Sequence, residues 1–180
     1  MILIRWVVLI FLGCLLAVGC QIKPTVVKDE SANHYNKALV VVDTRSALDY
    51  FSFHIPGSVS LNSADFLILK NPRTKKRVID PDLEQIVERL AKRGISPLKT
   101  IVLISEKKDS DENKKWNWLF LQLDIRDVAM MGLEDYLAHN KRVAPQATPD
   151  SVPVWEIKKK KFILKKADEC FVNWSDYDCL

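Results

Sequence analysis

Residues 38–58 read ALVVVDTRSALDYFSFHIPGS, and this stretch decides the fold. The run from Ala38 to Val42 is short, apolar and rich in β-branched residues, which predicts a buried strand. Ser46 and Asp49 fit a capping box that opens a short helix. In the element from His54 to Gly57, proline fixes φ and glycine permits a positive φ, so a tight turn follows the helix. The stretch therefore predicts a strand, a helix and a turn in close succession.

The chain beyond this stretch continues to alternate between strand and helix patterns. Ser58 to Leu61 alternates as a second strand, and residues 70–77 (KNPRTKKR) form a predicted basic loop. Asp80-Pro81 is typical of a helix start, so we expect a helix over 81–93 that stops at Gly94. Strands that alternate with helices predict an α/β fold with a mostly parallel sheet covered on both faces. The remaining expected elements are strands at 100–104 and 128–131 and helices at 116–123 and 132–139.

Several of these elements resemble the rhodanese family. In that family a strand ending in D-x-R leads to a G-H-I-P-G-A element; here the strand ends in DTR at 43–45 and the element reads FHIPGS at 53–58. Gly132-Leu133-Glu134 resembles the later G-G-L-E element of the family, with Met131 in place of the first glycine. The resemblance spans about residues 37–140. It implies the three-layer α/β fold of the family, with a central, mostly parallel sheet flanked by helices and, here, a C-terminal extension.

Five residues of the resembling elements receive structural roles. Pro56 and Gly57 shape the turn, and His54 is expected to hydrogen-bond nearby backbone. Asp43 and Arg45 are expected to form a polar pair that orders the adjacent loops. We assign none of these residues to catalysis.

The resemblance also identifies where the chemistry of an active rhodanese would lie. The family places a cysteine at the end of the strand that corresponds to 100–104, followed by a loop with glycine and arginine. Here Ser105 stands at that position, and residues 106–112 read EKKDSDE. Serine cannot carry a persulfide, and the acidic residues of this loop would repel an anionic substrate. We therefore predict a catalytically degenerate domain with no catalytic residue, no cofactor and no metal site.

The N-terminal segment predicts the location of the domain. Residues 1–20 read MILIRWVVLIFLGCLLAVGC, and the apolar run from Trp6 to Val18 has 13 residues. That is short for a bilayer, which takes about 20 residues, but typical of a signal-peptide core. Ala17 to Cys20 resembles the lipobox of bacterial lipoproteins, which implies a signal peptide at 1–19 and a lipid on Cys20. An uncleaved anchor helix is the alternative interpretation.

Both interpretations place the domain in the bacterial cell envelope, held on a membrane and facing the periplasm or the outside. Residues 20–36 are polar and form a predicted tether. The domain itself is expected at 37–142. The net charge of +4 is too mild to indicate nucleic acid, so the expected partners are the membrane, through the lipid anchor, and an unknown envelope protein.

Residues 143–180 form the C-terminal extension, in which Pro145, Pro149 and Pro153 indicate a linker or a strap over the surface. The run Lys158 to Lys161 is interpreted as a turn or an edge strand guarded by lysines. Contact of these lysines with anionic lipid head groups is the alternative.

The last two cysteines of the chain are predicted to form a disulfide. If Cys14 leaves with the signal peptide and Cys20 takes the lipid, Cys170 and Cys179 remain. In an oxidising compartment their spacing suggests that they close a small loop. Two free thiols are the alternative.

These observations favour a binding or scaffolding module over an enzyme. One rival is an envelope sulfurtransferase that uses Cys170 or Cys179 as its thiol, against which a disulfide between the two would count. Another is a structural lipoprotein that keeps the fold only as a spacer. Trp116 and Trp118 cannot share one helix face. Either one of them is exposed near the degenerate loop, or Trp118 packs on a second helix or under the tail.

Overall fold

The computed structural model describes residues 38–140, 147–175 and 179. The predicted signal peptide, Cys20 and the tether lie outside these residues. Within the described ranges, no helix combines the length and the apolar character needed to cross a membrane. All residues of the two hydrophobic clusters lie between Val40 and Cys179. A fragment that begins at Gln21 therefore retains the whole described core and is expected to fold on its own.

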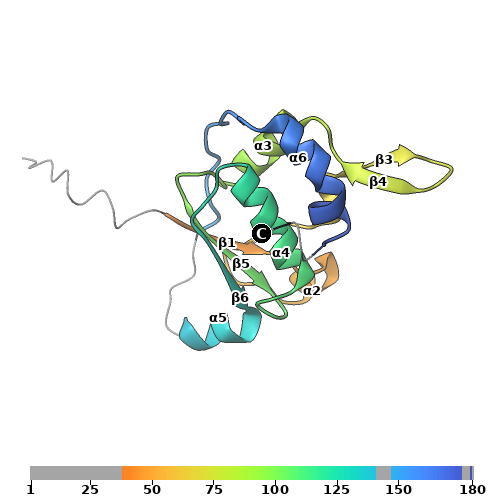
Figure 1. The fold of residues 1–180 in the computed structure, drawn as a ribbon. Coiled ribbons are helices and arrows are strands. Elements are labelled where there is room, and N and C mark those ends of the chain that lie inside the picture. Colours follow the sequence, from red (N-terminus) through yellow and green to blue (C-terminus); the bar gives the residue numbers. More distant parts are fainter. Residues whose placement is uncertain (1–37, 141–146, 176–178, 180) are drawn as a thin grey trace, which may run out of the picture. The chain divides into compact units, whose positions relative to one another are not determined.

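Four parallel strands form the central sheet in the order β2-β1-β5-β6, as Figure 1 shows. They are β1 (Leu39–Asp43), β2 (Val59–Ser60), β5 (Thr100–Ser105) and β6 (Val128–Gly132). Val41 lies beside Val102, which in turn lies beside Ala129. Because all four strands run the same way, their carboxyl ends meet at one edge. The predicted α/β fold with a parallel sheet and flanking helices is confirmed.

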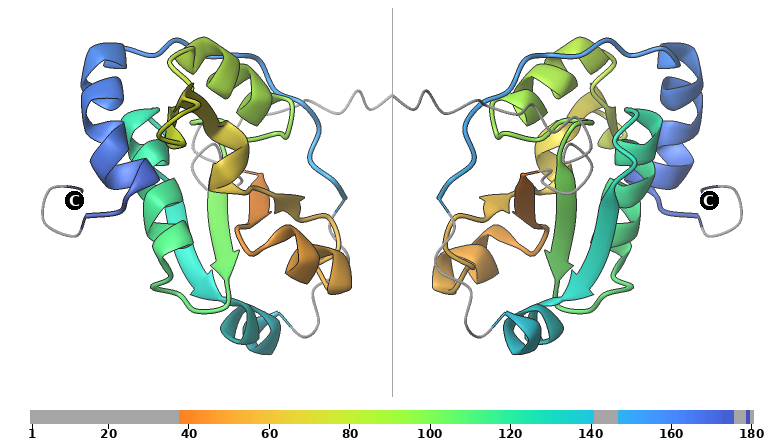
Figure 2. Two further views of the ribbon diagram at one scale, coloured as in Figure 1. Left: turned by 90° about the vertical axis from the view of Figure 1, so that its right-hand side faces the viewer. Right: turned by 90° about the vertical axis from the view of Figure 1, so that its left-hand side faces the viewer.

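One face of the sheet carries most of the core. Helices α3 (Leu83–Ala91) and α4 (Asp111–Gln122) cover it, and Figure 2 shows them together on the same side of the strands. Alternate residues of the central strands point toward these helices, as the period of two requires. The buried residues that the strands and the two helices contribute are Val40, Val42, Ile101, Leu103, Leu83, Ile86, Val87, Leu90, Trp116, Trp118, Leu119 and Phe120.

The opposite face is covered thinly. Its cluster of buried residues consists of Val41, Ile55, Val102, Ile104 and Tyr136. Helix α5 (Leu133–His139) contributes Tyr136, whereas helix α2 (Ala47–Ser52) has no buried residue at all. The covering of this face is therefore much sparser than the sequence led us to expect.

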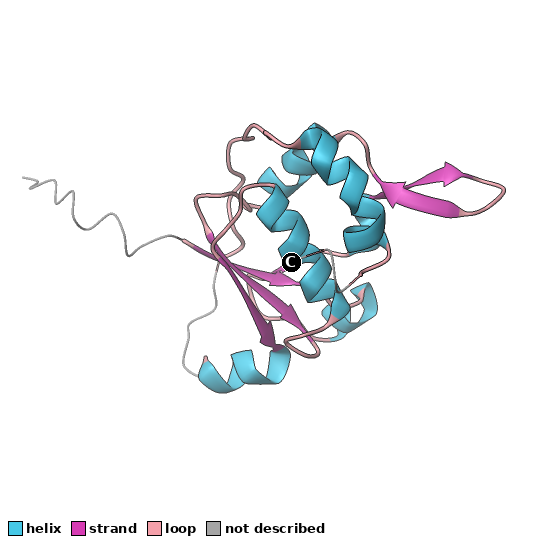
Figure 3. Ribbon diagram, in the orientation of Figure 1, coloured by secondary structure: helices cyan, strands magenta, loops and turns pink. Residues whose placement is uncertain are grey.

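The predicted basic loop at 70–77 is instead the tip of a β-hairpin. Strands β3 (Leu67–Asn71) and β4 (Lys76–Ile79) pair antiparallel, and the short 3-10 helix η2 (Ser63–Phe66) precedes them. Figure 3 shows the hairpin projecting from the domain. The pairs Leu67–Ile79 and Ile68–Val78 form its base. The charged run hides these strands in the sequence, because only the residues at its two ends are apolar.

Helix α3 begins later than predicted. Its N-cap is Asp82, whose carboxylate accepts a hydrogen bond from the backbone N–H of Gln85 at 3.1 Å. Asp80 instead accepts from the backbone N–H of Asp82 at 2.9 Å, so Asp80-Pro81 forms a turn before the helix. The stop at Gly94 is as expected, since this residue has a φ of +75°.

The C-terminal extension first crosses the domain as a strap. A Cβ added to Gly94 would lie 2.5 Å from Cβ of Pro149, so the strap approaches closer than any other residue type would allow. The backbone N–H of Val152 donates to the carbonyl of Ala91 at 2.9 Å. The indole N–H of Trp155 donates to the carbonyl of Leu123, also at 2.9 Å.

The tail then forms helix α6 (Lys160–Ala167) and a π-helical turn η3 (Asp168–Val172), so the expected turn or edge strand at the lysine run is wrong. This segment is helical rather than extended because a helix places Ile163, Ala167 and Phe171 on one face, where all three are fully buried. The predicted disulfide between Cys170 and Cys179 is present, with a Cα–Cα distance of 5.4 Å.

Neither tryptophan of helix α4 is exposed. Trp116 and Trp118 are both buried, although they point to different sides of the helix. The ring of Trp116 meets Phe171 of η3 edge-on, with ring centroids 5.2 Å apart. Of the two alternatives for this pair, an exposed tryptophan near the loop after β5 is therefore wrong, because α4 is enclosed between the sheet and the tail.

Candidate functional site

The carboxyl edge of the sheet brings together the residues that the sequence singled out. Residues 43–45 end β1 and the segment 105–109 leaves β5, and these two strands are neighbours. Gly132 ends β6, which lies on the other side of β5. In open parallel sheets, this edge is where loops converge to form binding sites.

Asp43 and Arg45 form the polar pair that the sequence predicts. Arg45 Nε donates to Asp43 Oδ1 at 3.0 Å, and Arg45 Nη2 donates to Asp43 Oδ2 at 2.7 Å. Both residues are buried. The hydrogen bonds that Arg45 donates to the carboxylate of Asp43 raise the pKa of the Arg45 guanidinium above its ordinary value, so this cation stays charged. A buried, bidentate pair of this kind fixes the positions of both partners.

Arg45 also connects two neighbouring segments. Its Nη2 donates to the backbone carbonyl of Phe53 at 2.7 Å, just after helix α2. Its Nη1 lies 4.0 Å from Oε1 of Glu106, the first residue of the loop after β5. The end of α2 and the loop therefore lie on either side of one buried guanidinium.

A buried asparagine holds the loop after β5, and the sequence did not reveal it. Asn113 is fully buried in the first turn of α4, and its Nδ2 donates to the carbonyl of Lys108 at 3.0 Å. The Thr44 hydroxyl lies 2.8 Å from Asn113 Oδ1 and 3.0 Å from the Ile104 carbonyl. Ser110 is the N-cap of α4. A single polar residue in a helical turn leaves no pattern that would predict such a clamp.

Ser105 ends β5 at this edge, with a side chain that is nearly inaccessible at 5% exposure. The residues after it, Glu106 to Asp109, are all exposed. A Cβ added to Gly132 would lie 3.5 Å from the carbonyl oxygen of Glu106, so the loop rests against the end of β6. Neither His54 nor His139 forms a hydrogen bond to Ser105. Nδ1 of His54 faces the carbonyl of Tyr50, and Nδ1 of His139 faces the carbonyl of Asp135.

The turn at 54–57 has the structural role that was predicted. Nδ1 of His54 lies 3.1 Å from the carbonyl of Tyr50, and the two rings stack with centroids 4.5 Å apart. Gly57 has a φ of +79°, which favours glycine. Ile55 reaches into the thin cluster beneath the sheet.

An apolar rim borders this site. Leu48 and Phe51 on α2 and Phe53 just after it expose 76%, 81% and 49% of their surface. Large apolar side chains this exposed, gathered on one short helix, are typical of a surface that another molecule covers. The sequence did not identify this rim, because apolar residues in a short helix are ordinarily expected to be buried.

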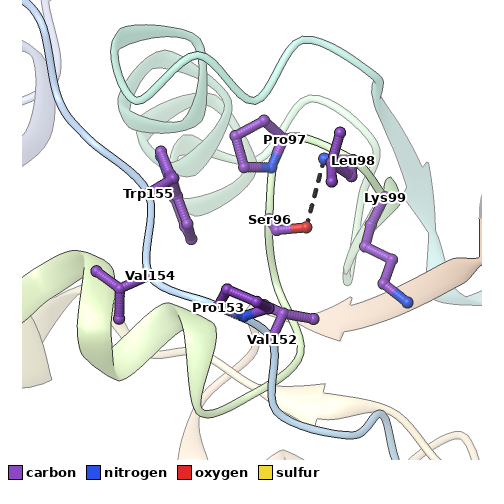
Figure 4. Close-up of a pocket in the computed structure, with 8 residues that line it drawn as sticks. All are labelled: Ser96, Pro97, Leu98, Lys99, Val152, Pro153, Val154 and Trp155. Carbon is purple, nitrogen blue, oxygen red and sulfur yellow. Dashed lines mark hydrogen bonds between the residues drawn. The ribbon is translucent and has the colours of Figure 1, made fainter.

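A separate apolar cavity lies at the other edge of the sheet. It has a volume of about 400 Å³, and Figure 4 shows it between residues 96–99 and the strap residues 152–155. Residues 96–99 precede β5, so this cavity is at the amino ends of the strands and away from Ser105. In the described part of the chain, no group of three or more histidine, cysteine or acidic residues is placed to hold a metal ion.

Comparison with known protein families matches residues 27–139 to the rhodanese-like domain. The comparison with curated proteins gives no match. The matched range contains the 43–45 segment, the turn at 54–57, the loop after Ser105 and Gly132. The family match therefore covers all parts of the candidate site.

Proposed function

The chain belongs to the rhodanese-like domain family, and from this premise we propose that it is a membrane-anchored, catalytically inactive member that acts as a binding or scaffolding module in the bacterial cell envelope. The observation that carries the proposal is Ser105 at the end of β5. Sulfur transfer requires a thiolate that takes a sulfur atom from a donor and forms a new S–S bond. A hydroxyl at this position cannot form that bond.

The surroundings of Ser105 also argue against catalysis. A thiolate or an anionic intermediate would need backbone donors and net positive charge, whereas the exposed residues 106–109 (EKKD) carry two acidic and two basic side chains. The first turn of α4 carries Asp111 and Glu112, whose charges oppose a second anion there. Glu112 itself turns away toward Ser63 and Lys115.

The disulfide counts against the rival enzyme. A sulfurtransferase that used Cys170 or Cys179 would need one of them as a free thiol, but the two sulfurs are bonded to each other. Both cysteines also belong to the large cluster on the α3–α4 side of the sheet and are nearly inaccessible. Attack on a soluble sulfur donor would require reduction and local opening.

The exposed rim supports a binding role. Leu48, Phe51 and Phe53 are exposed on the segment at α2, which Arg45 connects to the ordered loop through the carbonyl of Phe53 and the carboxylate of Glu106. A fixed loop next to exposed aromatic side chains provides shape and apolar contact area at low entropic cost, which suits a protein partner. The predicted lipoprotein signal would keep this surface at a membrane.

The first test is a sulfurtransferase assay on the fragment that begins at Gln21. Thiosulfate is the donor and cyanide the acceptor, and the Ser105→Ala and Cys170→Ser/Cys179→Ser variants run beside the wild type. We expect no turnover from any of the three proteins. Turnover that disappears only in the cysteine variant would overturn the proposal and place the active thiol in the tail.

A cysteine introduced at the degenerate position sharpens this test. We expect Ser105→Cys to remain inactive, because the site is nearly inaccessible and burial would raise the pKa of the new thiol. The native variant should react slowly with an aromatic disulfide reagent, and the unfolded variant quickly. Restored sulfur transfer in Ser105→Cys would show that only the nucleophile is missing and that the loop is still built for catalysis.

A crosslinking experiment tests the binding role. A photoreactive residue at Phe51, which is 81% exposed, should give a discrete adduct in cells of the native host. Leu98 is a matched control, since it is 79% exposed but precedes β5 at the opposite edge of the sheet. Equal adducts from both positions, or none from Phe51, would favour the alternative that the domain is only a spacer.

A further inference from the structure

The projecting hairpin is rich in positive charge. Residues 67–79, here named the basic arm, contain Lys70, Arg73, Lys75, Lys76 and Arg77 and no acidic residue. The other residues of the chain contain 22 basic and 23 acidic side chains, against 27 and 23 for the whole. The local charge of the basic arm, five positive groups and no negative one, therefore exceeds the net charge of +4 of the whole chain.

The base of the arm is fixed to the domain. Ile79 is buried in the large cluster, and Leu67 packs against it. Lys76 forms an ion pair with Asp168 of η3 at 3.4 Å, which ties β4 to the tail. The tip is shaped by Asn71, whose side chain accepts hydrogen bonds from the backbone of Arg73 and Thr74. The arm is thus an ordered ribbon with a set direction, as Figures 1 and 3 show.

Lys76 is the one cation of the arm with an acidic partner in the described part of the chain. Among the described residues, Lys70, Arg73, Lys75 and Arg77 form no ion pair, and all four are exposed. Lys70 lies in the irregularity between Leu69 and Asn71, where the register of the two strands shifts. A bulge of this kind twists a ribbon and protects its edge from pairing with other strands. The arm is therefore poorly suited to strand addition and well suited to contact through its side chains.

Exposed aliphatic side chains accompany these cations. Ile68 and Leu69 of β3 are 41% and 51% exposed. Helix α6 packs beside β4, exposes Phe162 and Leu164, and begins in the lysine run at 158–161. Apolar and basic side chains are therefore interleaved on both elements, which is the composition of surfaces that lie in the head-group region of a membrane.

We propose that the basic arm docks on a membrane surface that contains anionic phospholipids. Its cations bind the phosphate head groups, while Leu69, which lies on the same face of the ribbon as its cross-strand partner Arg77, enters the boundary below them. Nucleic acid is a poorer fit, because residues 67–79 contain no aromatic side chain on which a base could stack. Leu69 would also find no apolar partner along a phosphate backbone. The proposal uses neither the lipid on Cys20 nor the rim at α2.

Vesicle binding by the fragment that begins at Gln21 tests this proposal without interference from the N-terminal segment. Vesicles of phosphatidylcholine are compared with vesicles that also contain phosphatidylglycerol. We expect partitioning only onto the anionic vesicles, and its loss at about 1 M salt, where charges are screened within about 3 Å. The arm variant replaces Lys70, Arg73, Lys75 and Arg77 with glutamine. Each basic side chain contributes roughly a factor of five near an anionic surface, so binding should fall several hundredfold.

A second variant controls for net charge. Lys92→Gln/Lys107→Gln/Lys108→Gln/Arg126→Gln removes the same number of exposed charges from other elements and should weaken binding by less than about threefold. Circular dichroism and a thermal melt confirm that both variants are folded. Equal losses in the two variants would overturn the proposal, because only the total charge would then matter.

Two further readouts identify the ligand. Leu69→Ser should weaken binding to anionic vesicles about tenfold, by removing apolar insertion. Arm-dependent binding of double-stranded DNA that is tighter than vesicle binding would overturn the proposal in favour of a nucleic-acid partner. These readouts are independent of the sulfurtransferase assay and of crosslinking at Phe51, so failure here leaves the proposed function standing, and the reverse also holds.

Discussion

The two faces of the sheet differ in how they are covered. The face toward α3 and α4 is buried under two helices and then under the tail, so that even Phe171 is fully enclosed. The opposite face has a cluster of five buried residues, and its helix α2 leaves Phe51 81% exposed. The same strands serve both faces, since alternate residues point to each. Stability is thus concentrated on one side, which leaves the other free to expose apolar side chains.

The carboxyl edge of the sheet is held independently of residue 105. Asp43, Arg45, Thr44 and Asn113 hold this edge through buried hydrogen bonds. None of these hydrogen bonds involves the side chain of residue 105. A substitution at residue 105 should therefore leave these contacts in place.

The largest expected effect comes from removing a large side chain on the covered face. Phe120→Ala should lower the free energy of unfolding by about 3–5 kcal/mol, because Phe120 is fully buried in the large cluster. Phe51→Ala should change it by less than about 0.5 kcal/mol, since this ring is exposed. Urea unfolding of the fragment that begins at Gln21 measures both. Comparable losses would show that the two faces do not differ as described.

Removal of the disulfide should have the second largest effect. Cys170→Ala/Cys179→Ala should cost about 2–3 kcal/mol, because the bond closes a loop with a sequence separation of 9. Hydrogen exchange should become faster in α4 and η3 and stay unchanged around Tyr136. A reducing agent should reproduce the loss in the wild type and do nothing to the variant. Faster exchange on both faces would contradict the separation between them.

The loss of the hydrogen bonds of Asn113 to the loop after β5 should have the third largest effect. Asn113→Ala should cost about 2 kcal/mol, because the carbonyl of Lys108 and the hydroxyl of Thr44 each lose a hydrogen-bond partner. Backbone amides at 106–109 should exchange faster. Asn117→Ala on the same helix is the matched control and should leave those amides unchanged. An unaltered loop in Asn113→Ala would mean that Gly132 and the helix cap suffice to hold it.

The smallest effect is a pH dependence on the thin face. Burial raises the pKa of Tyr136 above its ordinary value of 10.0, because the phenolate is poorly solvated there. Its contribution to stability is complete below pH 10.0 and is lost as the pH rises through the pKa of the folded state. Tyr136→Phe should therefore flatten the alkaline fall in stability, which urea unfolding at a series of pH values measures. An identical fall in the variant would contradict this assignment.

Regular apolar patterns made most of the fold predictable from the sequence. The strand at 100–104, the turn at 54–57 and the stop at Gly94 follow from local chemistry, and the structure has all three. The Asp43–Arg45 pair was also predictable, because two opposite charges at the end of a buried strand satisfy each other. The position of Ser105 at the end of β5 follows from the same strand.

The features that escaped prediction depend on contacts between distant segments. The arm and α6 were missed because lysine runs obscure their periodicity, and only packing against η3 and α4 reveals it. Asn113 was missed because its partner Thr44 is 69 residues away. The rim at α2 is exposed because no other segment in the described part of the chain covers its apolar side chains. A local sequence pattern cannot predict whether a distant segment will pack on a helix.

The enclosure of α4 by the tail has a consequence for biosynthesis. The family match ends at residue 139, but the ring of Trp116 packs against Phe171, which is synthesised later. Until the tail has been synthesised, a growing chain would expose the aromatic side chains of α4 that the tail covers, and it would require protection from aggregation. A truncation drawn at the family boundary would be trapped in the same unfinished state, so expression trials should carry the chain through Cys179.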